Sequence, residues 1–270
     1  MVPSISKKKF QEIIWDYYKK EGRVLPWRQT RNAYYILVSE VMLQQTQVDR
    51  VIPKYKAFLA TFPTVNTLAK ASQIEILRLW QGLGYNRRAL ALRRLAEEVV
   101  AQYGGRLPRS IEKLEKLSGI GPYTAGAVAV FSWNKSHPLI ETNIRNVYTH
   151  FFFEGMGQIE DREILVLVEK TLPLENPREW YYALMDYGAM LKKTHRDLNS
   201  KSKHYARQSK FEGSNRQIRG GILKMLLAGE ATQSVLCSVL DIEEERGKRI
   251  LAGLETEGFL KRNENVYFLS

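Results

Sequence analysis

The sequence predicts an all-α protein with a small winged-helix-like module at its C-terminal end. Apolar residues recur at helical spacing throughout the first 190 residues, and glycine or proline separates the segments at short intervals. No fixed-period repeat and no persuasive multi-strand pattern interrupts this region. We expect short amphipathic helices over residues 7–20, 34–46, 49–61, 65–70, 73–80, 86–103, 111–117, 122–132, 141–152, 160–171 and 176–191.

The chain is strongly basic. It carries a formal net charge of +12 over 270 residues, of which 44% are hydrophobic, enough to fill one or two cores. A basic surface gains free energy by neutralising phosphates and releasing counterions, so we expect a polyanionic partner such as double-stranded DNA. General solubility is the alternative explanation of the charge.

Cysteine content and hydropathy exclude several classes of protein. One cysteine, Cys237, excludes an internal disulfide and any zinc or iron–sulfur site built from several cysteines. No apolar run is long enough to span a bilayer, and the N-terminus lacks the apolar core of a signal peptide. We therefore expect a protein without membrane contact, located in the cytoplasm, or associated with the nucleoid if its source is bacterial.

Three segments follow one another along the chain. We expect a helical domain at residues 1–191, a basic connecting segment at 192–215 and a winged-helix-like domain at 216–270. The connecting segment begins with Lys192 and Lys193 and has few apolar anchors. Either a DNA-contacting loop or a solvated linker fits this composition.

The C-terminal pattern is typical of a winged helix, which combines three helices with a β-hairpin. Helices are expected near 216–228, from Thr232 and near 243–257. Strands are expected at 259–261 and 266–269, around a turn at Asn263, Glu264 and Asn265. The third helix carries both basic and acidic residues, so DNA binding and protein contact both stay open for this module.

A glycine turn lies between two apolar segments at residues 117–125. Gly119 and Gly121 bracket Ile120 and allow the positive φ angles of a tight helix-hairpin-helix turn, and Thr124 can cap the next helix. The outward amides of such a turn form an anion site suited to one DNA phosphate. A Gly-x-Gly pair alone is usually only a turn, so nearby carboxylates decide its meaning.

Glu40 lies within an apolar segment that includes Val38 and Leu43. A carboxyl group hemmed by apolar side chains has a raised pKa, which suits a general acid near neutral pH. Cleavage of an N-glycosidic bond needs an acid for the departing base, a negative charge for the sugar cation and extrusion of the base. The alternative for Glu40 is an ordinary solvent-facing glutamate.

Glu141, close to Asn143, is the candidate for that negative charge. It can also cap the helix that starts near residue 142, and the two roles are compatible. Gln45 and Thr46, with Gln44, supply amides and a hydroxyl that can read a base edge or fill a vacated stack. An exposed polar turn is the alternative.

Five sequence blocks together resemble the MutY-type adenine DNA glycosylases of the helix-hairpin-helix glycosylase superfamily. The blocks are residues 25–28 (LPWR), 39–48 (SEVMLQQTQV), 62–64 (FPT), 80–85 (WQGLGY) and the turn at 117–125. The resemblance covers roughly residues 8–191, and the block from Glu40 to Val48 is its most specific part. It implies two all-α lobes with the active site in the cleft between them.

The resemblance also implies roles for the candidate residues. Glu40 matches the glutamate that protonates adenine and then helps to activate water. Tyr123 stands where bifunctional relatives carry a Schiff-base lysine, so a monofunctional enzyme without AP lyase activity is expected. Asn143 follows the family pattern and supports Glu141. The implied DNA- and base-binding residues are Trp27 and Arg28 at the adenine pocket, and Gln45, Thr46, Leu83 and Tyr85 in the duplex near the opposite base.

Three departures from the family pattern stand out. Glu141 replaces the family's aspartate and adds a methylene group. The family's larger C-terminal domain is replaced by the winged-helix-like module. The basic segment from 192 to 210, which begins with Lys192 and Lys193, is expected to replace the DNA contact of the family's iron–sulfur cluster, and no cluster, metal or other cofactor is expected. The four ligand positions of that cluster hold Lys192, Asn199, Ser202 and Gln208.

We therefore expect a monomeric, monofunctional DNA glycosylase of base excision repair that removes adenine opposite 8-oxoguanine or guanine. A thymine or uracil glycosylase of the same fold is the first alternative, since the pocket residues do not exclude it. A non-catalytic DNA-binding protein is the second, motivated by the change at Glu141 and the lost cluster ligands.

Overall fold

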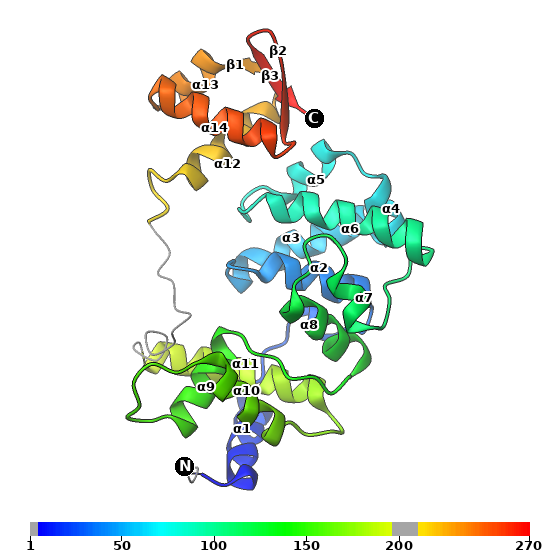
Figure 1. The fold of residues 1–270 in the computed structure, drawn as a ribbon, viewed down its shortest axis with the longest axis vertical. Helices are drawn as coiled ribbons and strands as arrows, with labels where there is room; N and C mark the ends of the chain where they lie inside the picture. The colour runs from blue at the N-terminus through cyan, green and yellow to red at the C-terminus, as the bar shows by residue number, and fades with distance from the viewer. Residues whose placement is uncertain (1–4, 196–209) are drawn as a thin grey trace. The chain divides into compact units, whose positions relative to one another are not determined.

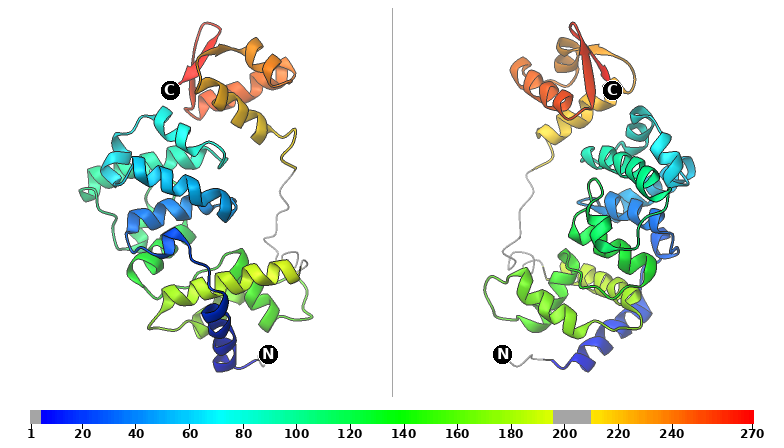
Figure 2. Two further views of the ribbon diagram at one scale, coloured as in Figure 1. Left: turned by 180° about the vertical axis from the view of Figure 1, so that it is seen from behind. Right: turned by 45° about the vertical axis from the view of Figure 1, so that its right-hand side comes forward.

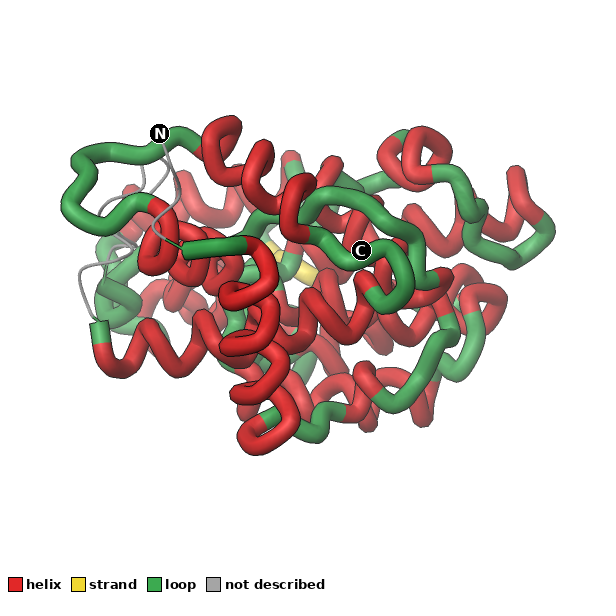
Figure 3. The backbone as a smooth tube through the Cα atoms, turned by 90° about the horizontal axis from the view of Figure 1, so that it is seen from below, coloured by secondary structure: helices red, strands yellow, loops and turns green. Residues whose placement is uncertain are grey.

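The computed structural model describes residues 5–195 and 210–270, and Figure 3 shows that helices form nearly all of its regular structure. Up to residue 195 the elements are α1 (Lys7–Glu21), the 3-10 helix η1 (Pro26–Arg28), α2 (Ala33–Leu43), α3 (Val48–Thr61), α4 (Val65–Lys70), α5 (Gln73–Trp80), α6 (Arg87–Tyr103), α7 (Ile111–Glu115), α8 (Pro122–Trp133), α9 (Thr142–Phe152), α10 (Asp161–Thr171) and α11 (Pro177–Thr194). From residue 210 they are α12 (Asn215–Leu226), β1 (Ala231–Thr232), α13 (Gln233–Val239), α14 (Glu244–Thr256), β2 (Leu260–Asn263) and β3 (Val266–Leu269). The predicted fold class is confirmed.

Serine and threonine caps define where several helices begin. Each cap oxygen accepts a hydrogen bond from an amide that has no partner within its own helix, so the helix starts at that point. This local signal explains why predicted and observed helix starts agree closely. The capping residues are Ser6 for α1, Thr64 for α4, Ser72 for α5, Ser110 for α7, Ser214 for α12 and Thr232 for α13.

The helix after the glycine turn starts at residue 122, as predicted, but its cap differs from the prediction. Thr124 is not its cap: α8 begins at Pro122, with Gly121 as the N-cap residue, and Thr124 is buried in the first turn. A proline at the first helical position already has the required φ and lacks an amide that needs a partner. Gly121 is extended, with a φ of −98°, and only Gly119, with a φ of 77°, uses the left-handed region.

Two helix ends differ from the prediction by three residues each. The helix expected at 34–46 stops at Leu43, because Gln45 has a left-handed φ of 54°. α11 continues through Lys192 and Lys193 to Thr194, so the first residues of the predicted connecting segment are helical. The predictions for Asn199, Ser202 and Gln208 lie outside the described residues.

The described residues form two compact units. The first contains the chain up to Glu40, Pro108–Lys116 and the residues from Ile120 to the end of α11. In it, α11 packs against both α1 and α9, and α10 packs against α9 (Figure 1). The ring of Phe10 in α1 lies 5.0–5.7 Å from four other aromatic rings and anchors the core of this unit. These rings belong to Tyr148, Phe151, Phe152 and Trp180.

The second unit contains Val41–Leu107, Leu117–Gly119 and the described residues from 210 onward. Its α6 packs against α4 and α5, and α3 packs against α5 (Figure 2). Phe58 is fully buried there, with ring centroids 5.1 Å from Phe62 and 6.0 Å from Trp80. This small aromatic core supports the loop that follows α5.

The C-terminal module has the predicted three helices and hairpin, with two differences. Asn263 pairs with Val266 at the end of β2, so the turn consists of Glu264 and Asn265 alone. The sequence also gave no signal for β1, which pairs with β3 and produces the strand order β1-β3-β2. Within the second unit, Gln73 of α5 donates hydrogen bonds of 3.0 Å to the carbonyl oxygens of Gly258 and Phe259.

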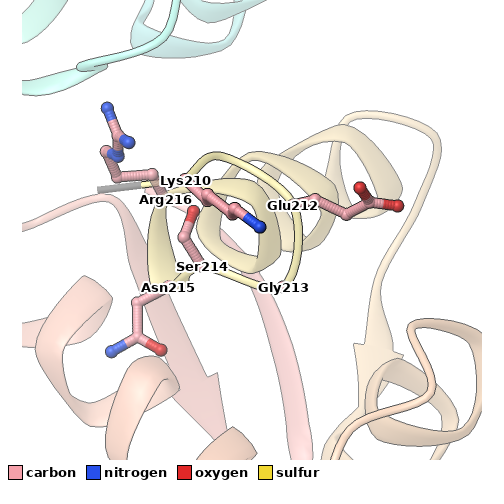
Figure 4. Close-up of a pocket in the computed structure, with 6 residues that line it drawn as sticks. All are labelled: Lys210, Glu212, Gly213, Ser214, Asn215 and Arg216. Atoms are coloured by element: carbon pink, nitrogen blue, oxygen red, sulfur yellow. The ribbon is translucent and has the colours of Figure 1, made fainter. Parts of the chain in front are cut away.

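An open pocket lies at the start of α12 (Figure 4). Glu212 and Arg216 project on opposite sides of it, as Figure 4 shows. Arg246 of α14 donates to the Gly213 carbonyl at 2.7 Å and to Asn215 Oδ1 at 2.8 Å. These bonds connect the residues that line the pocket to α14 of the C-terminal module. None of the candidate catalytic residues lines this pocket. Its lining residues are Lys210, Glu212, Gly213, Ser214, Asn215 and Arg216.

Candidate active site

Glu40 is the acidic residue of α2, a helix that is otherwise almost entirely apolar. The residue is half-buried, and the neighbours that surround it in the helix are no more than 5% exposed. An environment of this kind disfavours a charged carboxylate. Burial, and then the negative charge of Glu141, raises the pKa of Glu40 to about 8. The buried neighbours are Leu37, Val38, Ser39, Val41 and Met42.

Tyr123 lies in the first turn of α8 and its hydroxyl donates a hydrogen bond to the Glu40 carboxylate. This bond lowers the pKa of Glu40 and so opposes the effect of burial. Burial, together with the charges of Glu40 and Glu141, raises the pKa of Tyr123 well above its usual value. Tyr123 therefore remains a neutral donor at neutral pH.

Glu141 caps the N-terminus of α9. Its Oε1 accepts hydrogen bonds from the amides of Asn143 at 2.9 Å and Ile144 at 3.0 Å, while Oε2 accepts from Asn143 Nδ2 at 3.2 Å. Burial raises the pKa of Glu141, against the lowering effect of these bonds and of the Arg145 charge. Arg145 itself is held by two bonds of 2.7 Å to Asp161.

Glu40 and Glu141 interact electrostatically but lie in different environments. The amides and the side chain that donate to Glu141 favour its ionised form, and its charge then helps to keep a proton on Glu40. Burial raises both pKa values, but at Glu141 two amides, the Asn143 side chain and the Arg145 charge oppose that effect. Glu40 is therefore the better candidate for the acid and Glu141 for the anion. The first unit thus brings together Glu40, Tyr123, Glu141 and Asn143, as the sequence predicted.

The backbone around Glu141 is fixed by α11. Gly188 packs directly on Asn143: a Cβ atom at position 188 would lie 2.2 Å from the Asn143 carbonyl oxygen. The Tyr181 hydroxyl donates to the His137 carbonyl at 2.8 Å and accepts from the Leu139 amide at 2.9 Å. These contacts hold the segment leading into α9, and with it the cap residue Glu141.

Arg28, expected at the base pocket, forms a buried ion pair with Asp186 of α11. Both guanidinium Nη atoms donate to the carboxylate at 2.8 Å, and the two side chains are 7% and 1% exposed. Burial pushes the pKa of Asp186 upward, but the bonds and charges from Arg28 and Arg23 outweigh it, and the pKa is lowered. The Arg28 guanidinium also lies 4.5 Å over the Tyr182 ring. Trp27 is buried beside it in the chain, at 4% exposure.

The residues expected to enter the duplex lie on two loops of the second unit. Gln45 and Tyr85 both have left-handed backbone, with φ of 54° and 48°, and both are exposed. Thr46 Oγ1 donates to the carbonyl of Leu83 at 3.3 Å and so joins the two loops. Leu83 was also expected to enter the duplex, but its side chain is 3% exposed and packs inside the protein.

The glycine turn is attached to α6. Gly119 sits against Ala91, whose Cβ would be 2.7 Å from an added Cβ at position 119. Glu98 accepts hydrogen bonds from the amide of Ser118 at 2.9 Å and from its hydroxyl at 2.5 Å. The Ser118 amide is therefore engaged by a carboxylate, and any phosphate at this turn depends on the amides from Gly119 onward.

Lys192 and Lys193 are exposed on the last turn of α11, and their predicted contact with phosphate stays a prediction. Within residues 5–195 and 210–270, no three His, Cys, Asp or Glu side chains converge as a metal site requires. No helix in these ranges combines the length and apolar character needed to cross a membrane.

Sequence reasoning missed the residues that support the site. Asp186 is a single carboxylate within the apolar stretch of α11, and a buried charge in such a stretch signals a cationic partner. Gly188 follows two residues later, and a glycine inside a helix signals a close approach. Arg88 of α6 donates hydrogen bonds to the carbonyl oxygens of Gln44 and Gly84 on the two loops. It gave no signal in the sequence, because basic residues are common on the exposed faces of helices.

The chain is similar to known proteins over most of its length. Residues 38–170 match the family described as HhH-GPD superfamily base excision DNA repair protein. An adenine DNA glycosylase of Mycolicibacterium smegmatis is 32% identical over 94% of this chain and 94% of its own length. The adenine DNA glycosylase of Homo sapiens is 34% identical over 71% of this chain, which spans 37% of that longer protein. A solved structure of a thermostable thymine-DNA glycosylase superposes with a TM-score of 0.62 and 26% identity, covering 74% of this chain and 96% of that one.

Proposed function

Since this chain belongs to the HhH-GPD superfamily of base excision DNA repair proteins, we propose that it hydrolyses the N-glycosidic bond of adenine opposite 8-oxoguanine or guanine in double-stranded DNA. The observation that carries the proposal is the Glu40–Tyr123–Glu141 group, in which the pKa of Glu40 is raised to about 8 and the Glu141 carboxylate accepts hydrogen bonds from two backbone amides. Relatives named adenine DNA glycosylase support the choice of base.

In the proposed reaction, Glu40 gives its proton to a ring nitrogen of the extruded adenine. The bond from C1′ to the base then breaks, and its electron pair leaves with the base. The Glu141 carboxylate stabilises the sugar cation that remains. Glu40, now ionised, accepts a proton from the water whose oxygen adds to C1′. Atoms and charge balance without any further reactant.

We also propose that the protein neither cleaves the DNA strand nor carries an iron–sulfur cluster. A tyrosine at position 123 offers no amine for a Schiff base, so base release leaves an intact abasic strand. With Cys237 as its one cysteine, the chain cannot supply the four thiolates of the family's iron–sulfur cluster, and we propose that the protein functions without a cluster. We further propose that it acts as a monomer on chromosomal DNA, in the cytoplasm or nucleoid.

A second candidate is a thymine glycosylase, favoured by the 26% identity to the thermostable thymine-DNA glycosylase. The same Glu40 and Glu141 chemistry serves either base, so only the substrate separates the two candidates.

Single-turnover base release distinguishes them. Duplexes would carry A opposite 8-oxoguanine, A opposite G, T opposite G and U opposite G, with alkali added to reveal abasic sites. We expect adenine release, fastest opposite 8-oxoguanine, with no strand breaks before alkali. Thymine or uracil release alone would reassign the substrate, and no release from any duplex by a DNA-binding protein would support the non-catalytic alternative. The Glu40→Gln variant, which keeps the shape of the side chain, should bind DNA and release no base.

A further inference from the structure

The guanidinium of Arg88, at the start of α6, donates hydrogen bonds to carbonyl oxygens at the C-terminal end of α2. Nη1 donates to the carbonyl oxygens of Val41 at 2.7 Å, Met42 at 3.0 Å and Gln44 at 2.7 Å. The last carbonyls of a helix have no partner within that helix, so a cation placed there satisfies and stabilises them. Arg88 therefore fixes the point at which α2 stops and the Gln45 loop begins.

The same guanidinium also holds the loop that follows α5. Nη2 donates to the carbonyl oxygens of Gly84 at 3.0 Å and Leu83 at 3.3 Å, and to Thr46 Oγ1 at 3.2 Å. Nε donates to the Tyr85 carbonyl at 3.4 Å. One planar fork thus binds two loops that are about forty residues apart in sequence.

An arginine is required for this arrangement. Its five N–H donors point in fixed directions in one plane, whereas a lysine ammonium carries three donors on a single atom. The guanidinium is half-buried, 5.5 Å from the Trp80 ring and 5.6 Å from the Tyr85 ring. Burial lowers the pKa of Arg88 to about 10, so the side chain keeps its charge at neutral pH.

The carbonyls that Arg88 binds include those directly before the two left-handed residues of these loops. The Gln44 carbonyl belongs to the peptide group leading into Gln45, and the Gly84 carbonyl to the group leading into Tyr85. A non-glycine residue in the left-handed region costs on the order of 1–3 kcal/mol and persists only when its surroundings determine it. Arg88 is the shared partner that orients both peptide groups.

We propose that Arg88 is a positioning residue that holds Gln45 and Tyr85 together in the conformation in which they enter the duplex while the target base is extruded. Both side chains are exposed and lie on linked loops, and the Tyr85 hydroxyl accepts a hydrogen bond of 2.8 Å from Arg216, which a duplex entering here would have to replace. Extrusion of a paired base costs a few kcal/mol. Side chains that fill the vacated stack offset more of this cost when they are already ordered, because no free energy is then spent on ordering them. This inference rests on the proposed glycosylase function.

Two substrates separate positioning from general support of the fold. One duplex carries adenine opposite 8-oxoguanine, and the other carries the same adenine opposite an abasic site, where no pairing has to be broken. We expect Arg88→Lys to slow release from the paired duplex by roughly 10- to 100-fold, and release from the unpaired adenine by less than about threefold. Arg94→Ala, an exposed arginine on the same helix, should slow neither.

Equal slowing of both substrates by Arg88→Lys, with a matching fall in Tm, would overturn the inference and leave Arg88 a structural residue. Thr46→Val is a milder second variant, because it removes one acceptor and the link to Leu83 while keeping the side-chain shape. It should show the same selective loss.

Fluorescence of 2-aminopurine at the target position, recorded on binding and before base release, measures extrusion. Wild-type protein should raise this fluorescence and Arg88→Lys should not, whereas an equal rise in both would count against the inference. Failure of the wild-type protein to release adenine from either duplex would refute the proposed function, and the fluorescence comparison would still decide the role of Arg88.

Discussion

Gly188 of α11 lies so close to Asn143 of α9 that a Cβ atom on it would be 2.6 Å from the Asn143 carbonyl carbon. The two helices therefore touch through backbone at the point where Glu141 caps α9. Because both partners of this contact are backbone atoms, neither can relieve a clash by changing its rotamer, as a flexible side chain would. Placement of the Glu141 carboxylate depends on a position that carries no functional group.

Gly188→Ala should push α11 and α9 apart. Overpacking of this kind costs roughly 1–3 kcal/mol, against about 1 kcal/mol gained from the better helix propensity of alanine. The net cost is therefore up to about 2 kcal/mol, and we expect a Tm lower by up to about 8 °C and slower base release. Gly220→Ala in α12 is the matched control, since its added Cβ meets no atom within 4 Å and should raise the Tm slightly. Equal Tm changes in the two variants, measured by differential scanning calorimetry, would contradict the backbone contact.

Tyr123→Phe should move the pH profile of base release toward higher pH. Catalysis needs protonated Glu40, so the single-turnover rate should fall as pH rises through its pKa of about 8. The Tyr123 hydrogen bond lowers that pKa, and its removal must raise it. The alkaline fall of the variant should therefore lie above that of the wild type, with the ring volume unchanged.

The control is Tyr103→Phe in α6, which removes a hydroxyl outside the site and should leave the profile in place. The prediction fails if the rate of Tyr123→Phe falls at a lower pH than that of the wild type, or does not fall in the alkaline range. Either result would show that a group other than Glu40 sets the alkaline limb of the profile.

Much of this site was predictable because the environment of its residues depends on their neighbours in the sequence. Glu40 stands alone in an apolar helix, and Glu141 directly precedes the helix α9, so burial and capping follow from neighbours in the chain. The relationship between Gly188 and Asn143 was not predictable, since it joins two helices 45 residues apart in sequence. The same holds for Arg88, whose acceptors come from two separate loops.

The failed predictions also have physical causes. Thr124 has the chemistry of a cap, but the proline two residues earlier starts the helix first. Leu83 sits between two exposed glycines, and nothing in that pattern shows that its side chain turns inward. Local rules identify the loops, whereas tertiary packing decides which side chain each loop presents.

Glu141→Gln should separate the structural and chemical roles of this residue. The amide oxygen can still accept from the Asn143 and Ile144 amides, so the cap and the Tm should persist within about 2 °C. The negative charge is lost, and release should slow by roughly 10²–10³-fold, as for the loss of one charge-stabilising group. Glu141→Asp, which keeps the charge and restores the residue expected from the family resemblance, should retain activity. Wild-type rates in Glu141→Gln would remove Glu141 from the stabilisation of the sugar cation.

Glu40→Gln should stabilise the folded protein most at alkaline pH. The folded-state pKa of Glu40 is raised to about 8 from 4.5, so the folded state holds this proton more tightly than the unfolded chain does. The stability that follows is fully present below pH 4.5 and is lost as pH rises through about 8, where a buried carboxylate must be charged. Glutamine stays neutral throughout, so the Tm difference between variant and wild type should grow from pH 5 to about pH 9. Glu12→Gln on the exposed face of α1 removes the same charge and should show no such trend. A Tm difference that is constant across this pH range would mean that Glu40 is ionised in the folded protein, and the acid role would then pass to another group.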